Sequence, residues 1–244
     1  MSLSLQAVDA VILSMLPAPF EWRAIPGGNV ALKAGGYLPE AAAIAVSPFT
    51  IAKYPVTNAQ YARFIEAGGY AAQEYWTRSG WKQRHRYAWE APRFWNEPGY
   101  SHPNAPVIGV TWFEAVAFCR WLSAETDLSI TIPSEVQWQR AAQGDDTREF
   151  PWGDVDPLPE TCNWARAHNG TTPVDAYPDA ASPFGVMDLC GNVWELTRTH
   201  WETGTDEFEG IDRRVVRGGS WVNDSPITLM TTLRDGPYPM DGYM

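Results

Sequence analysis

Three segments of the chain combine a helix-start signal with apolar residues at helical spacing. Thr57, Thr111 and Ser134 each stand three residues before a Glu or Gln, so each pair can satisfy the other's free backbone donor. We predict helices from Thr57 to just before Gly68, from Thr111 to about Thr126, and from Glu135 to about Ala142. The apolar residues on the predicted faces are Tyr61, Phe64 and Ile65 in the first segment and Ala115, Phe118, Cys119 and Leu122 in the second.

The rest of the chain is rich in Pro, Gly, Asn and Trp and has few long periodic runs. Short strands are predicted at Phe49–Ala52, Ser129–Ile132 and Arg214–Arg217. We find no internal repeat and no clear linker. The pattern therefore predicts one loop-rich α+β domain over residues 21–244, with residues 1–20 as an N-terminal extension. Ordered loops of this length are usually functional.

Composition narrows the classes of partner. The chain has 18 Lys+Arg against 29 Asp+Glu and a formal net charge of −11, which disfavours a nucleic-acid or polyanion partner. No apolar run approaches the roughly 18 to 20 residues of a membrane-spanning helix. The odd number of cysteines, three, leaves at least one free thiol, which favours a reducing compartment, and we predict a cytoplasmic protein.

A series of motifs follows in one order along the chain. In this order the motifs resemble the sulfatase-modifying-factor family, whose best-known members are the formylglycine-generating enzymes. The resemblance covers roughly residues 20–244 and implies a C-type-lectin-like fold with few helices and short strands. The motifs are Tyr54 to Tyr61, Pro106-Val107, Val110 to Trp112, Ile132 to Trp138, Pro151 to Gly153, Thr172 to Val174, Gly191 to Glu195 and Arg217 to Trp221.

The resemblance also indicates which metal ligands an active family member would carry. Formylglycine-generating enzymes hold copper with two cysteines shortly after the Gly-Gly-Ser motif, and here Trp221 to Leu229 contains no cysteine. Because Cu(I) favours sulfur ligands, we predict no copper. A second branch, the iron-dependent sulfoxide synthases, adds a helical domain with clustered histidines. The four histidines of this chain could form an iron site only by converging from distant positions: His85, His102, His168 and His200.

The resemblance implies a calcium site around the Gly191 to Glu195 motif. Glu195 would supply a carboxylate oxygen, and Gly191 and Val193 would supply backbone carbonyls. Asp188 adds a carboxylate within reach of the same loop, and hard oxygen ligands of this kind suit Ca²⁺. The alternative is that both acids cap or pair locally without metal.

The segment after the Gly-Gly-Ser-Trp motif departs most from the family. Variable proteins of diversity-generating retroelements share this fold and place their diversified residues after a similar motif. The leading hypothesis is therefore a non-catalytic ligand- or protein-binding module, with rigid aromatic and adaptable polar contacts. The alternatives are a fixed surface loop and a metal-dependent oxidoreductase with a non-standard site. The candidate contact residues are Trp221, Asn223, Asp224, Thr228, Thr231, Tyr238 and Tyr243.

Overall fold

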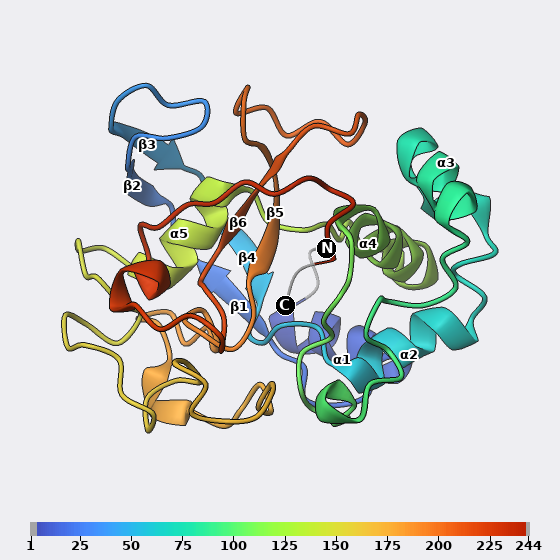
Figure 1. The fold of residues 1–244 in the computed structure, drawn as a ribbon, viewed down its shortest axis with the longest axis horizontal. Coiled ribbons are helices and arrows are strands. Elements are labelled where there is room, and N and C mark those ends of the chain that lie inside the picture. Colours follow the sequence, from blue (N-terminus) through green and yellow to red (C-terminus); the bar gives the residue numbers. More distant parts are fainter. Residues whose placement is uncertain (1–3, 243–244) are drawn as a thin grey trace.

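The fold is described from a computed structural model that covers residues 4–242 (Figure 1). Its helices are α1 (Leu5–Met15), α2 (Asn58–Glu66), α3 (Arg78–Tyr87), α4 (Trp112–Thr126) and α5 (Glu135–Gln143). Its strands are β1 (Trp22–Ile25), β2 (Gly28–Leu32), β3 (Ala42–Val46), β4 (Phe49–Ala52), β5 (Glu195–His200) and β6 (Arg214–Arg217). Four short 3₁₀ helices lie at Gln73–Tyr75, Pro98–Tyr100, Pro178–Ala180 and Pro226–Leu229.

The three predicted helices are confirmed as α2, α4 and α5. Each begins with the expected reciprocal cap, in which Thr57, Thr111 or Ser134 accepts from the backbone of the residue three positions later. The helix α4 ends at Asp127, whose positive φ of 55° stops the helical turn. The capping chemistry therefore sets where these helices start.

Two of the three predicted strands are confirmed as β4 and β6, but the strand predicted at Ser129–Ile132 does not form. The hydroxyl of Ser123, on α4, accepts from the Ile130 amide and donates to the Ile130 carbonyl, so both backbone groups are occupied locally. The one backbone bond to β5 in this region, from Arg198 to Pro133, falls just after the segment. A side chain that satisfies the backbone competes with strand pairing in this way.

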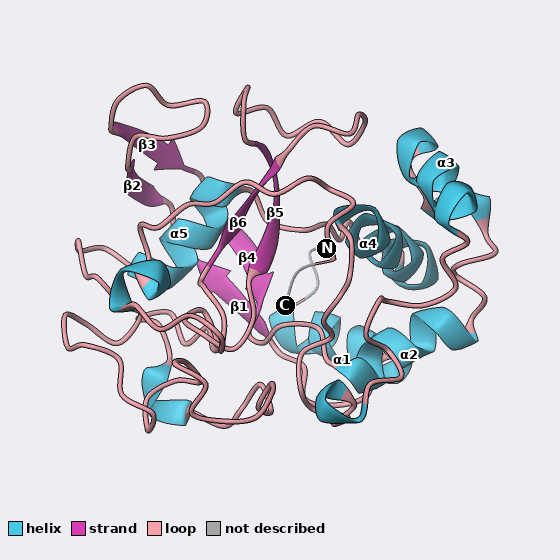
Figure 2. Ribbon diagram, viewed as in Figure 1, coloured by secondary structure: helices cyan, strands magenta, loops and turns pink. Residues whose placement is uncertain are grey.

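The strands form three separate antiparallel pairs, β1–β4, β2–β3 and β5–β6 (Figure 2). In the first pair Trp22 lies opposite Ala52, and in the last pair the register shifts between Leu196 and His200. Long loops connect the pairs and make up much of the molecule. The prediction of a loop-rich α+β fold with short strands is confirmed.

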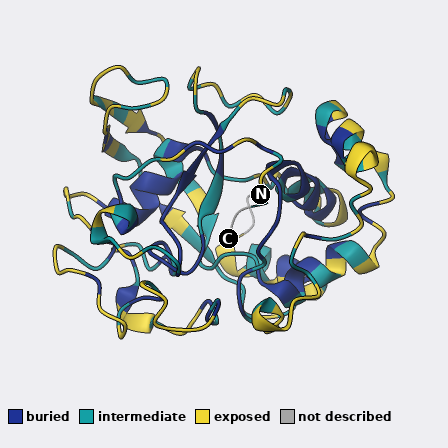
Figure 3. Ribbon diagram, in the orientation of Figure 1, coloured by how far each residue is buried: buried dark blue, intermediate teal, exposed yellow. Residues whose placement is uncertain are grey.

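The largest core cluster lies in the helical half, where α1, α2 and α4 meet (Figure 3). Tyr61 of α2 stacks on Phe118 of α4 with ring centroids 5.3 Å apart. The helix α1 places Ile12 in the same core, and Leu16, which follows α1, is buried there too, so part of residues 1–20 packs on the domain. Among residues 4–242, no helix is long and apolar enough to cross a membrane.

Candidate functional site

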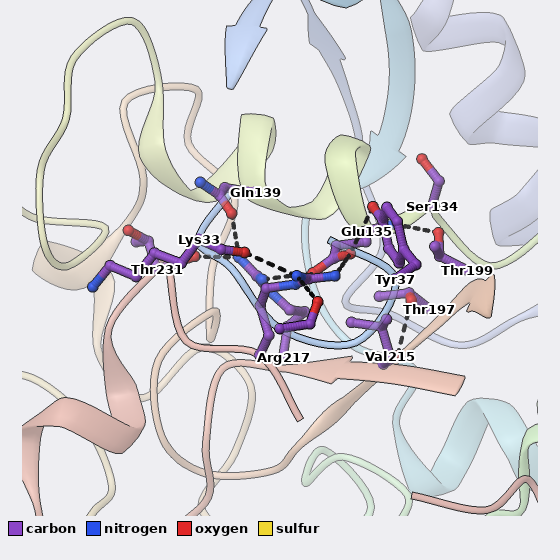
Figure 4. Close-up of polar contacts among 12 residues, drawn as sticks. Lys33, Tyr37, Ser134, Glu135, Gln139, Thr197, Thr199, Val215, Arg217 and Thr231 are labelled. Carbon is purple, nitrogen blue, oxygen red and sulfur yellow. Dashed lines mark hydrogen bonds and ion pairs between the residues drawn. The ribbon is translucent and has the colours of Figure 1, made fainter. Parts of the chain in front are cut away.

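A buried ion network fixes the start of the Arg-Gly-Gly-Ser motif (Figure 4). Arg217 of β6 donates to the Glu135 carboxylate at 2.9 Å, and Arg234 donates to the same carboxylate at 2.5 and 2.9 Å. Tyr37 donates to it as well, at 3.2 Å. Burial lowers the pKa of Arg217 to about 10. One carboxylate thus compensates two buried cations, and the network joins β6, α5 and the C-terminal segment.

The glycines of the motif are required by close packing. Gly219 has a φ of +72°, and a Cβ there would lie 2.5 Å from the Leu229 side chain and 2.8 Å from the Thr228 carbonyl oxygen. Only glycine fits both the left-handed backbone and the close approach. The motif therefore turns the chain tightly against the 3₁₀ helix at Pro226–Leu229.

The candidate contact residues fall into separate environments. Trp221, at 9% exposure, and Thr231, at 0%, are buried, and the Thr231 hydroxyl donates to the Arg148 carbonyl. Asn223 closes a turn by accepting from the Ser220 amide at 2.8 Å.

The remaining candidates lie at the surface or outside the described residues. Asp224 is exposed, and the Thr228 hydroxyl donates to the Ser225 carbonyl of its own turn at 2.6 Å. Tyr238 is 56% exposed. It lies on a segment whose carbonyls accept from the backbone amides of Arg214 and Trp112. Tyr243 lies outside the described residues. The candidates from Trp221 to Thr228 follow one another along one segment, with Trp221 buried and Asp224 exposed, whereas Tyr238 lies on a different segment.

The candidate calcium loop is built by a network of amides. The Asn192 side chain donates to Asp188 at 2.8 Å and to the Thr172 carbonyl, and it accepts from Asn163 at 3.1 Å. Gly191 has a φ of +74°, and a Cβ there would lie 2.4 Å from the Asn163 carbonyl oxygen. This network ties the Asn163–Thr172 loop to the segment that precedes β5.

Two carboxyl groups beside this loop have no cationic partner among residues 4–242. Glu195 Oε1 is buried and accepts no hydrogen bond from any residue between 4 and 242. Burial raises the pKa of Glu195 to about 8, although the nearby indole of Trp138 lowers it. Burial also raises the pKa of Asp188 well above its usual range, and the charge of Glu195 adds to that shift.

A polar cavity of about 580 Å³ lies between α4, the segment after α3 and the C-terminal segment. It combines one cation, Arg93, with two acids, Glu114 and Asp241, and with the aromatic rings of Trp89 and Phe94. A cavity with aromatic walls and a few charged groups is typical of small-molecule sites. The remaining lining residues are Ala91, Gly109, Thr111, Met240 and Gly242.

Glu114 is the most perturbed acid of this cavity. Its carboxylate accepts from the Tyr70 hydroxyl at 2.5 Å and from the Thr111 amide at 2.7 Å, and its residue exposure is 1%. Burial raises its pKa to about 7, against the lowering effect of both donors. A carboxyl that exchanges its proton near neutral pH in a cavity is a candidate for acid–base chemistry.

The sequence offered one signal for this site. Of the three capping boxes, two close with Gln60 and Gln137, and only the box at the start of α4 closes with an acid, Glu114. Trp89 and Arg93 lie in the Trp-rich stretch from Tyr75 to Trp95. The spacing of its aromatic residues does not show which side chains are buried in the core and which line a groove.

The histidines do not converge on a metal site. Across residues 4–242, no three His, Cys, Asp or Glu side chains are grouped as a metal-binding set. His168 instead contacts the Tyr177 hydroxyl at 3.0 Å, and the His102 ring accepts from the Asn104 amide. The structure does bring Cys162 and Cys190 into one buried cluster, a contact that their sequence spacing gave no reason to expect.

Comparisons with known proteins place the chain in one family. Residues 20–240 match the family model described as "Sulfatase-modifying factor enzyme 1-like domain". The chain is 34% identical over 223 residues to a protein named hercynine oxygenase from Mycolicibacterium thermoresistibile, covering 80% of this chain and 48% of that protein. It is 29% identical over 262 residues to a formylglycine-generating enzyme from Thermomonospora curvata, covering 82% of each.

A solved structure shares the fold at lower sequence identity. The Treponema denticola variable protein 1 superposes with a TM-score of 0.68 and 18% identity, covering 91% of each chain. At this identity the likeness shows the fold alone. The chain spans about half the length of the hercynine oxygenases that it matches.

The leading hypothesis of a non-catalytic binding module is wrong. Hercynine oxygenases from three mycobacterial species are 33–34% identical over 80% of the chain, and these relatives are enzymes. The segment from Trp221 to Leu229 lacks the cysteine pair of one branch, but a shared fold does not fix a single reaction. With residues 20–240 matched to one family model, the chain belongs to the sulfatase-modifying factor enzyme 1-like family.

Proposed function

We propose that this chain is the formylglycine-generating-enzyme-like part of an oxygenase related to hercynine oxygenase. We further propose that the cavity lined by Arg93, Glu114 and Asp241 holds its small-molecule substrate. The observation that carries the proposal is this cavity, which pairs opposite charges between aromatic walls. The 34% identity to a hercynine oxygenase supports the reaction class.

The chemistry of the cavity fits a small zwitterion. Arg93 can donate two parallel hydrogen bonds to a carboxylate. The rings of Trp89 and Phe94, together with Asp241, suit an ammonium group, because aromatic faces and carboxylates both attract cations. Hercynine is the first compound to test, since the relatives are named for it.

Within this proposal the residues of the chain bind the substrate and manage a proton. Glu114 Oε1, which accepts from Tyr70, would hold or release a proton near neutral pH. The metal of such an oxygenase supplies oxygen activation when bound. Across residues 4–242, no three His, Cys, Asp or Glu side chains are grouped as a metal-binding set, so none of these residues is assigned to the metal.

Replacing Arg93 by Met is expected to weaken hercynine binding at least tenfold, because a hydrogen bond to a charged group contributes roughly 1.5–3 kcal/mol. Isothermal titration of the purified protein measures this. The matched control is Arg63→Met, which removes an exposed cation on α2 outside the cavity. Equal affinities for the Arg93 and Arg63 variants would refute the proposed carboxylate contact.

We also propose a structural calcium ion at the loop before β5. The unpartnered buried oxygen of Glu195 supports it, and so do the carbonyls of Gly191 and Val193, which accept no hydrogen bond from residues 4–242. Asp188 adds a second carboxylate beside the loop. The ion would supply the positive charge that these acids lack, and its role would be structural.

Calcium at one hundred times its dissociation constant is expected to stabilise the protein by about 2.7 kcal/mol. Thermal unfolding in calcium and in chelator measures the difference. The variant Glu195→Gln should lose the response, whereas Glu74→Gln, at an exposed position, should keep it. No calcium response in the native protein would show that the two acids pair locally without metal.

A further inference from the structure

The helix α3 carries a stripe of cations on its exposed face. Arg78, Lys82 and Arg86 follow one another at four-residue spacing, so they lie on one side of the helix, and all three are exposed. His85 is exposed next to them. This concentration stands out because the chain as a whole has a net charge of −11.

The stripe has no anionic partner among residues 4–242, since none of its three cations takes part in an ion pair there. Glu209 approaches the start of α3, but its carboxylate accepts from the backbone amides of Arg78 and Ser79. Each pair of like charges four residues apart destabilises a helix by about 0.2–0.5 kcal/mol. Only Arg86, in the last turn, is favoured by the helix dipole.

Two aromatic rings, at the last residue of α3 and just after it, continue the stripe. The Arg86 guanidinium lies 5.4 Å from the centre of the Tyr87 ring, and Tyr87 stacks on Trp89 at 5.7 Å with an interplanar angle of 14°. Tyr87 is 50% exposed. The face therefore offers both charge and fixed contact area, the combination that interfaces favour.

The opposite side of α3 is held firmly by the domain. Gly80 and Gln83 are buried, and a Cβ at Gly80 would lie 3.0 Å from the Phe113 side chain of α4. The helix lies at the periphery of the molecule, with its outer side exposed (Figures 1 and 3). The cation stripe is therefore a fixed surface that a partner can reach.

We propose that the stripe of Arg78, Lys82 and Arg86, with Tyr87 beside it, docks an acidic segment of a partner protein. One cation per helical turn, about 6 Å apart, matches carboxylates spaced along an extended or helical segment. A nucleic acid fits less well, because the remaining surface of the chain is strongly acidic and repels a long polyanion. The three cations of the stripe do not line the proposed substrate cavity, but Trp89, which stacks on Tyr87, lies at the boundary between the two sites.

The test compares two variants that change the net charge equally. Lys82→Glu with Arg86→Glu reverses two charges on the stripe, and Lys33→Glu with Arg63→Glu reverses one Lys and one Arg at exposed positions elsewhere. The probe is a fluorescein-labelled decaglutamate peptide, followed by anisotropy at low and high salt. We expect at least tenfold weaker binding for the stripe variant than for the control variant, and loss of native binding in high salt.

Four outcomes would overturn the proposal. They are no peptide binding by the native protein, equal weakening in both variants, tighter binding of a single-stranded oligonucleotide than of the peptide, and self-association of the native protein that the stripe variant abolishes. Thermal unfolding of both variants shows whether they are folded. If the Glu variant unfolds, Lys82→Ala with Arg86→Ala replaces it, and its peptide affinity must still fall below that of Lys33→Ala with Arg63→Ala.

Discussion

Replacing Glu135 by Gln is expected to lower the free energy of unfolding by about 3–5 kcal/mol, because it leaves Arg217 and Arg234 buried without a counter-charge. Both guanidiniums donate to this carboxylate, and the Glu135 and Arg217 side chains are fully buried. Gln offers one acceptor oxygen where the carboxylate offers two. Equilibrium unfolding in urea, read by tryptophan fluorescence, measures the loss.

The control for this experiment is Glu66→Gln, which breaks an exposed pair with Arg63. Exposed pairs contribute about 0–1 kcal/mol, so this variant should unfold close to the native protein. If Glu135→Gln lowers the free energy of unfolding no more than Glu66→Gln does, the buried network is not what holds β6, α5 and the C-terminal segment together.

Replacing Glu114 by Gln is expected to remove a pH dependence of stability. The pKa of Glu114 is about 7 in the folded protein against 4.5 for the free side chain, so between these values the folded state binds more protons. Stability from this group is fully present below about pH 4.5 and is lost as pH rises through 7. As the pH rises from below 4.5 to above 7, this carboxyl should lower the free energy of unfolding of the native protein by up to about 3 kcal/mol, the amount that the pKa shift implies.

Urea unfolding at pH 5, 6.5 and 8 tests this expectation for both proteins. Gln closes the capping box at Gln60 and Gln137, so Glu114→Gln keeps the cap of α4. Arg93 and Asp241 also line the cavity, and both proteins keep them. The buried titratable groups near Glu114 are Tyr61 and Tyr70, whose pKa values burial raises, and Cys119, whose pKa burial raises to about 12. The buried tyrosines and Cys119 stay neutral between pH 5 and pH 8. If the free energy of unfolding depended on pH equally in the native protein and in Glu114→Gln, Glu114 would not be the source of the pH dependence.

Local chemistry explains which elements the sequence predicts. The caps at Thr57, Thr111 and Ser134 are contacts between neighbours in sequence, so their residues identify α2, α4 and α5 directly. By contrast, α3 has buried positions only at Gly80 and Gln83, so its pattern of apolar residues is weak. Its N-terminus is completed by Glu209, which is 130 residues from Ser79 along the chain.

The candidate site is predictable only in part for the same reason. The candidate calcium loop lies within a few residues, from Asp188 to Glu195, and a motif can therefore point to it. The cavity joins Arg93, Glu114 and Asp241, which meet only when α4 and the C-terminal segment fold together. The hypothesis of a non-catalytic module rested on the missing cysteine pair, on four histidines far apart in sequence, and on the divergent segment after Trp221.

A crystal structure of the protein soaked with hercynine would show whether the cavity lined by Arg93, Glu114 and Asp241 holds the substrate. The proposed function predicts that the compound lies in the cavity beside α4, with a carboxylate against Arg93 and a ring of Trp89 or Phe94 against its cationic group. Hercynine bound at any other place, or an empty cavity at a concentration that saturates binding in solution, would contradict it.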